Sequence, residues 1–276
     1  MIPSGPGDAS FGSLTVGYGC GADPNLIGPE LGFGFGMRDA LPAGEKFLIV
    51  KTAWGGKSLA GDFRPPSSVK SFDPYCQGDC PNVVGHFYEV LVADVHAMLA
   101  PGAIAKMFPD LAGLTPSLTG IGWYHGWNDG CDLNATAAYE QNMVNLVTDL
   151  RAEFGVPDLA VSIATAGFNG FDGAEATRRP PGFWPDFPPA EKISTSCAAF
   201  ARACLRLDIL LSQLAAANAT RHPGLGHIAA METRQLWRDP QFSPNQAEGY
   251  HYWHNSETAY LAGRLMAQGM VQAMQA

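Results

Sequence analysis

The sequence has little positive charge and no long apolar run. It contains 17 Lys and Arg against 26 Asp and Glu, which gives a formal net charge of −9 over 276 residues. Nucleic acids and acidic membrane surfaces are bound by clustered positive charge, so this composition argues against both as partners. No stretch has the length and hydrophobicity of a membrane-spanning helix, and residues 1–8 show no signal-peptide pattern. The expected partner is a small, uncharged or weakly charged molecule.

Cysteine is sparse, and its spacing does not specify a metal site. The six cysteines are Cys20, Cys76, Cys80, Cys131, Cys197 and Cys204. Three disulfides and the glycosylation sequons at Asn134 and Asn218 would fit a secreted protein, but buried thiols explain the same cysteines equally well. Cys76 and Cys80 lack a second ligand pair at zinc spacing, which favours a local disulfide over structural zinc. Localisation therefore stays open, with secretion as one alternative.

Apolar residues make up 46% of the chain, which is enough to bury the core of one large domain over residues 1–276. Short apolar runs alternate with helical patterns along the sequence. Strands are expected at 46–51, 118–123, 159–166 and 227–231, and helices from Pro29 or Glu30, over 86–99, 135–153 and 194–217, and around Leu261 to Met270. This alternation predicts an α/β fold with a parallel sheet between layers of helices.

Two of the predicted strands end in glycine-rich loops that carry polar side chains. Ligands of open α/β sheets bind at the carboxyl ends of the strands, so these loops are candidate site segments. The strand at 118–123 is followed by Tyr-His-Gly-Trp-Asn-Asp, and the strand at 46–51 is followed by Thr-Ala-Trp-Gly-Gly-Lys-Ser. Gly55 and Gly56 fit either backbone oxyanion donors or a tight turn. A phosphate loop is excluded because Lys51 stands where that motif needs its first glycine.

His251 lies in a loop just before the last predicted helix, with Glu248 three residues upstream. This pair has the chemistry of a general base and its orienting carboxylate, although a structural histidine fits the pattern as well. A metal site built from His251, His254 and Glu257 would lack further visible ligands. We therefore expect no metal and no cofactor.

Three segments together resemble a known family. They are Lys51-Thr-Ala-Trp-Gly-Gly-Lys-Ser-Leu59, Trp123-Tyr-His-Gly-Trp-Asn-Asp129 and His251-Tyr-Trp-His-Asn-Ser-Glu-Thr-Ala-Tyr-Leu-Ala-Gly263. In this order they are similar to the sialate O-acetylesterase-like (SASA) branch of the SGNH hydrolases, over roughly residues 14–272. The resemblance implies a three-layer α/β/α, flavodoxin-like fold. It also implies serine-dependent hydrolysis of O-acetyl esters on sugars, with a glycan or small-molecule ester as substrate.

The resemblance also assigns roles to residues. His251 takes the place of the catalytic histidine, and Glu248 stands where many SGNH enzymes have the aspartate of Asp-x-x-His. Gly55 and Gly56 fall where a backbone amide helps to form the oxyanion hole. Asn128 lies in the loop after the strand predicted at 118–123. His125 replaces the glutamine that donates to this hole. A histidine can donate through a ring nitrogen, but its reach and protonation differ from those of an amide.

The chain departs from the family pattern at the nucleophile. The family carries its serine in a Gly-Gln-Ser-Asn segment after a first, central strand, and the printed sequence contains no such segment. Ser4, Ser10 and Ser13 do not follow an apolar strand, and Ser58, in the Gly-Gly-Lys-Ser part of the first shared segment, is the alternative candidate. We expect the first strand to be missing, which makes this domain incomplete at its N-terminus.

Two functions follow from that departure. One is an esterase fragment that is inactive or nearly so as written. The alternative is a non-catalytic carbohydrate-binding pseudoenzyme that uses a cleft of aromatic side chains, because aromatic faces bind sugar rings. The candidate aromatic residues are Trp54, Trp123, Trp127, Tyr252 and Trp253.

Overall fold

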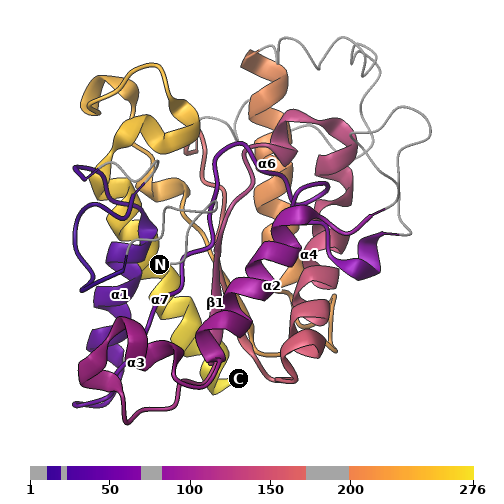
Figure 1. Ribbon diagram of the computed structural model, residues 1–276. Coiled ribbons are helices and arrows are strands. Elements are labelled where there is room, and N and C mark those ends of the chain that lie inside the picture. Colours follow the sequence, from indigo (N-terminus) through magenta and orange to yellow (C-terminus); the bar gives the residue numbers. More distant parts are fainter. Residues whose placement is uncertain (1–10, 20–23, 70–82, 172–198) are drawn as a thin grey trace.

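The computed structural model describes residues 11–19, 24–69, 83–171 and 199–276, with side chains of the last range described from Arg206 onward (Figure 1). Its sheet has three parallel strands in the order β1-β2-β3. The strands are β1 (Gly120–Tyr124), β2 (Ala160–Ala164) and β3 (Ile228–Met231). Within these ranges, no helix combines the length and the hydrophobicity needed to cross a bilayer.

Helices pack on both faces of the sheet. They are α1 (Pro29–Ala40), α2 (His86–Leu99), α3 (Ala103–Met107), α4 (Leu133–Phe154), α6 (Ala199–Ala216) and α7 (Ser256–Gln275). Short 3-10 helices occupy the connections: η2 (Pro66–Ser68), η3 (Pro109–Leu111), η4 (Asp129–Cys131), η6 (Arg234–Leu236), η7 (Pro240–Phe242) and η8 (Gly249–His254).

The central strand β2 shows how the layers arise from the sequence. All five of its residues are buried, as expected for a strand covered on both faces. Successive side chains point to opposite faces of a sheet. Val161 and Ile163 join the core cluster with α2, α4 and α6, whereas Ala160 packs with α1 and α7. The predicted α/β class with a parallel sheet is confirmed, and each strand overlaps a predicted one.

The α1 and α7 layer depends on glycine at the crossing of the two helices. A Cβ added to Gly32 would lie 1.9 Å from the Tyr260 carbonyl oxygen, and one added to Gly263 would lie 2.0 Å from that of Pro29. The helix backbones therefore approach each other more closely than any side chain would allow. This packing explains Gly32 and, against Ala267, Gly36, whereas Gly34 lies against Leu14 and Ile49.

Helix α4 is bounded as its sequence suggests and is tied to the sheet by one arginine. Asp132 caps its first turn by accepting the Asn134 and Ala135 amides, and Gly155 ends it at φ 65°. Near its end, the buried Arg151 guanidinium donates to main-chain carbonyls just before β2 and β3. The accepting carbonyls belong to Leu159, Leu225, Gly226 and His227.

The strand predicted at 46–51 is wrong. In the described part of the chain, residues 46–54 belong to no strand and make no backbone hydrogen bond. Phe47 and Leu48 are 40% and 39% exposed, so the segment is not buried on both faces. Its apolar composition favoured a strand, but a strand also needs a neighbouring row of amides and carbonyls, which a local pattern does not reveal.

Most of the cysteine predictions cannot be compared with the structure. Cys20, Cys76, Cys80 and Cys197 lie outside the described residues, and the Cys204 side chain does too.

Candidate active site

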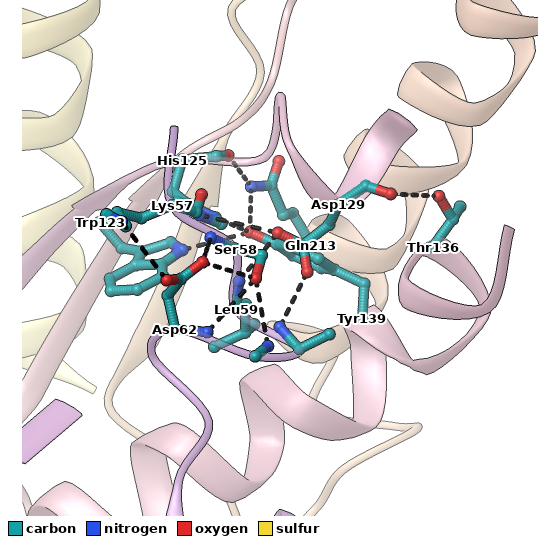
Figure 2. A network of polar contacts seen from close by, with 12 residues as sticks. Lys57, Ser58, Leu59, Asp62, Trp123, His125, Asp129, Thr136, Tyr139 and Gln213 are labelled. Atoms are coloured by element: carbon teal, nitrogen blue, oxygen red, sulfur yellow. Dashed lines mark hydrogen bonds and ion pairs between the residues drawn. The ribbon is translucent and has the colours of Figure 1, made fainter. Parts of the chain in front are cut away.

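A buried aspartate joins the two predicted site loops. The Asp129 carboxylate has no exposed surface and accepts the backbone N–H groups of Leu59 (2.8 Å) and Ala60 (2.9 Å), as Figure 2 shows. Burial raises the pKa of Asp129, while His125 and the two amides act in the opposite direction. The Gly-Gly-Lys-Ser turn is thereby held against the loop that follows β1.

This clamp places Gly56 beside Asn128. A Cβ built on Gly56 would lie 3.9 Å from Asn128 Nδ2, and the φ of Gly56 is +69°, a conformation that favours glycine. A Cβ on Gly55 would meet nothing within 4 Å, so the approach to its backbone is open. Two of the predicted oxyanion residues, Gly56 and Asn128, are therefore neighbours.

His125 is held inside a polar network (Figure 2). The Tyr139 hydroxyl accepts N–H groups from Trp123 (3.2 Å) and Gln213 (3.1 Å), so its single proton is donated to His125 Nδ1 (3.1 Å). The His125 Nε2–H then donates to the Lys57 carbonyl at 2.9 Å. To donate to an oxyanion, this N–H would first have to leave Lys57.

Ser58 closes a turn. It is 3% exposed, and its hydroxyl donates to the Asp62 carboxylate (3.0 Å) while accepting the Gly61 amide (3.1 Å). The backbone N–H of Ser58 donates to the same carboxylate at 2.9 Å. These bonds give Ser58, the alternative candidate for the nucleophile, a structural role.

His251 and Glu248, the predicted general base and its orienting carboxylate, lie close together at η8, just before α7. His251 Nδ1 lies 3.3 Å from Glu248 Oε2, and His254 Nε2 contacts the same oxygen. The His251 and Trp253 amides both donate to the Glu248 carbonyl, at 2.9 and 3.1 Å. The hydrogen bond from His251, with a further contribution from His254, lowers the pKa of Glu248.

A left-handed backbone turn positions the second histidine. Tyr252, Trp253 and His254 have φ values of 51°, 57° and 56°. Left-handed backbone costs a non-glycine residue roughly 1–2 kcal/mol, so three in succession are strained. Asn245 supports the turn with two hydrogen bonds. Its backbone N–H donates to the Trp253 carbonyl, and its side-chain oxygen accepts the backbone N–H of Glu248.

Aromatic contacts attach η8 to the loops that follow β1 and β2. The ring of Tyr250 lies 5.7 Å from that of Trp127, and the ring of Tyr252 lies 4.6 Å from that of Phe168 and 5.6 Å from that of Tyr124. Trp127 is adjacent in sequence to Asn128. The His251–Glu248 pair and the neighbours Gly56 and Asn128 therefore lie along the same edge of the sheet, the rim formed by the carboxyl ends of its strands.

Most of the aromatic residues proposed for a sugar cleft are used for packing. Trp123 and Tyr252 are buried, and Trp54 packs against Phe63 and Phe87 with ring centroids 6.0 and 4.6 Å apart. Trp127 is covered by the Arg206 guanidinium, 3.4 Å from its ring centre.

The sequence interpretation missed three residues of this region. Asp129 follows Asn128 directly, so an acid inside a glycine-rich loop was a usable signal. Tyr139 and Gln213 lie within helices α4 and α6 and give no local signal, because their roles depend on contacts with His125.

Comparison with known proteins assigns the family. A sequence model of the family described as carbohydrate esterase, sialic acid-specific acetylesterase, matches residues 19–179. This match covers more than half of the chain and includes both loops joined by Asp129. No curated protein and no solved structure matches the chain. The chain belongs to the sialic acid-specific acetylesterase family of carbohydrate esterases.

Proposed function

We propose that this chain acts on O-acetyl esters of sugars by acyl transfer. The observation that carries the proposal is the His251–Glu248 pair, 3.3 Å apart, on the rim that also holds Gly56 and Asn128. A base, its orienting carboxylate and a group of N–H donors are the parts that ester hydrolysis needs. Membership of the family supports a small-molecule or glycan substrate.

Each residue has a defined role in this proposal. Donation of the His251 Nδ1–H to Glu248 fixes the ring and gives Nε2 the lone pair of a general base. The Gly55 and Gly56 amides and the Asn128 side chain stabilise the oxyanion of the tetrahedral intermediate, where one such donor is worth about 3–4 kcal/mol. His125 joins them only if its Nε2–H leaves the Lys57 carbonyl.

The attacking group is the weak part of the machinery. The printed sequence has no Gly-Gln-Ser-Asn segment, and the Ser58 hydroxyl is bonded to Asp62. We therefore propose that this chain hydrolyses esters only slowly, by direct attack of water. The water oxygen bonds to the acetyl carbon, His251 takes the water proton and returns it to the sugar oxygen, and the carbon–oxygen ester bond breaks. Loss of a nucleophile leaves this kind of residual catalysis in related sites.

An added nucleophile tests the proposal. The purified chain is incubated with an O-acetylated sialoside, with and without hydroxylamine, and acetate and acetohydroxamate are measured. We expect slow acetate release and faster hydroxamate formation, both lowered about 100-fold by His251→Gln because general base catalysis is lost. His96→Gln is the matched control, since His96 is an exposed histidine bonded to Glu153 at 3.0 Å. Equal rates in the parent and His251→Gln would refute the role of His251.

The binding alternative has one supporting observation. Tyr250 is 43% exposed beside Trp127, so part of an aromatic side chain is accessible to solvent at the rim. Sialoside binding that is lost in Tyr250→Ala, with no acetate or hydroxamate formed by the parent chain, would favour a carbohydrate-binding pseudoenzyme.

A further inference from the structure

Three metal-ligating side chains meet just before α7. One ligand atom from each of Glu248, His251 and His254 lies within 4.8 Å of the other two. We propose that these residues form a binding site for a divalent transition metal ion, with Zn²⁺ as the ion that suits the donors best.

The donor set fits zinc chemically. Two imidazoles and one carboxylate, with one coordination position left for water, are a ligand combination found in zinc enzymes. Zinc–ligand bonds of about 2.0–2.2 Å place tetrahedral ligand atoms about 3.3 Å apart. His251 Nδ1 and Glu248 Oε2 already have this separation, at 3.3 Å. His254 Nε2 contacts the same carboxylate oxygen, and the three ligand atoms lie within 4.8 Å of one another.

The backbone supports a function for His254 beyond the proposed hydrolysis. The base needs only Glu248 and His251, and neither of these lies within the left-handed residues 252–254. That strained turn brings a third ligand, His254, back to the carboxylate. Strain of this kind persists where the surrounding structure enforces it and is concentrated at ligand sites.

The charges identify which carboxylate is the ligand. Glu257, the acid considered from the sequence, forms an ion pair with Arg238 at 3.1 Å. Among the described residues, the ion pairs of Glu248 are with the two histidines and with no lysine or arginine. A cation bound between the imidazoles would therefore not have to displace a permanently charged side chain.

Metal titration of the full chain tests the site. After treatment with EDTA and its removal, the protein is titrated with ZnCl₂ in a calorimeter. We expect one equivalent to bind, His254→Gln and Glu248→Gln to weaken binding at least tenfold, and His96→Gln to leave it unchanged. No binding, or equal affinity in His254→Gln and the parent, would overturn the proposal.

A second measurement guards against misfolded variants. Co²⁺ added to the unsubstituted chain should give the intense visible absorption of a tetrahedral ion, and the weak spectrum of hydrated Co²⁺ would overturn the proposal on its own. Zinc bound at His251 Nδ1 replaces the proton that this atom donates to Glu248 in the proposed hydrolysis, so metal binding and general-base catalysis are alternative states of His251 and are measured separately. Failure of the hydroxylamine assay would therefore leave the metal result standing, and failure of the titration would leave the esterase proposal standing.

Discussion

Asp129→Ala should be among the most destabilising substitutions in the chain. Removal of this fully buried carboxylate leaves the Leu59 and Ala60 N–H groups without their acceptor. Each buried donor left unsatisfied costs about 1–3 kcal/mol, so the expected loss is about 2–6 kcal/mol. The free energy of unfolding of a typical domain is about 5–15 kcal/mol, which makes this loss a large fraction of the total.

The control is another aspartate with the same number of bonds. Asp132 also accepts two backbone amides, from Asn134 and Ala135, but it is only half-buried at the start of α4. Asp132→Ala should therefore cost about 0.5–2 kcal/mol, the usual price of a lost helix cap. Urea unfolding followed by tryptophan fluorescence measures both variants. A loss under 1 kcal/mol for Asp129→Ala, or equal losses for the two variants, would refute the reasoning.

Asp129 also predicts a direction of pH dependence. Burial raises its pKa in the folded protein above the unfolded value of about 3.9. Between these two pKa values the folded state binds more protons than the unfolded state. The contribution of Asp129 to stability therefore falls as pH rises from the unfolded pKa through the folded pKa. Asp129→Asn cannot titrate and should remove this decline from a series of urea unfolding curves.

Three further predictions concern other parts of the chain. Gly32→Ala places a Cβ 1.9 Å from a carbonyl oxygen of α7 and should lower the free energy of unfolding by about 1–3 kcal/mol, whereas Gly113→Ala, with no atom within 4 Å, should change it little; equal effects in urea would contradict the close packing. The hydrogen bond to His251 lowers the pKa of Glu248 in the folded protein, so the stabilising contribution of Glu248 is present above its unfolded pKa and is lost as pH falls through its folded pKa. Glu248→Gln should weaken this loss of stability at low pH, measured by pH titration followed by circular dichroism. Ser58→Ala should cost about 1–3 kcal/mol of stability but leave acetate release within twofold, and a folded variant without activity would instead identify Ser58 as the nucleophile.

The sequence was sufficient for the elements whose signals are local. β1, β2 and β3 were found because they are short apolar runs that alternate with helical patterns, and α1 was found from Pro29 and Glu30 in its first turn. The run 46–51 has the same composition and failed as a strand. Its conformation depends on whether another strand lies beside it, and no window of sequence contains that information.

The residues of the candidate site also fall into those that a local sequence pattern reveals and those that it does not. Gly56, Asn128 and the Glu248–His251 pair could be proposed from motifs and short spacings. The network around His125 could not, because it joins α4 and α6 to the loop after β1 across many intervening residues. From the sequence, His254 was considered together with Glu257, whereas in the structure it contacts Glu248. The left-handed turn that brings it there contains no glycine, so the sequence gives no local signal for it.

Arg151 links the segments that enter β2 and β3. Its guanidinium donates to the carbonyls that precede β2 and β3, at the amino ends of these strands, whereas the candidate site lies at their carboxyl ends. The amino ends of β2 and β3 are therefore tied together through one side chain. In amide hydrogen exchange, we expect the loops at the carboxyl ends of the strands to exchange first. The amides at the amino ends of β2 and β3 should exchange only when the whole domain unfolds.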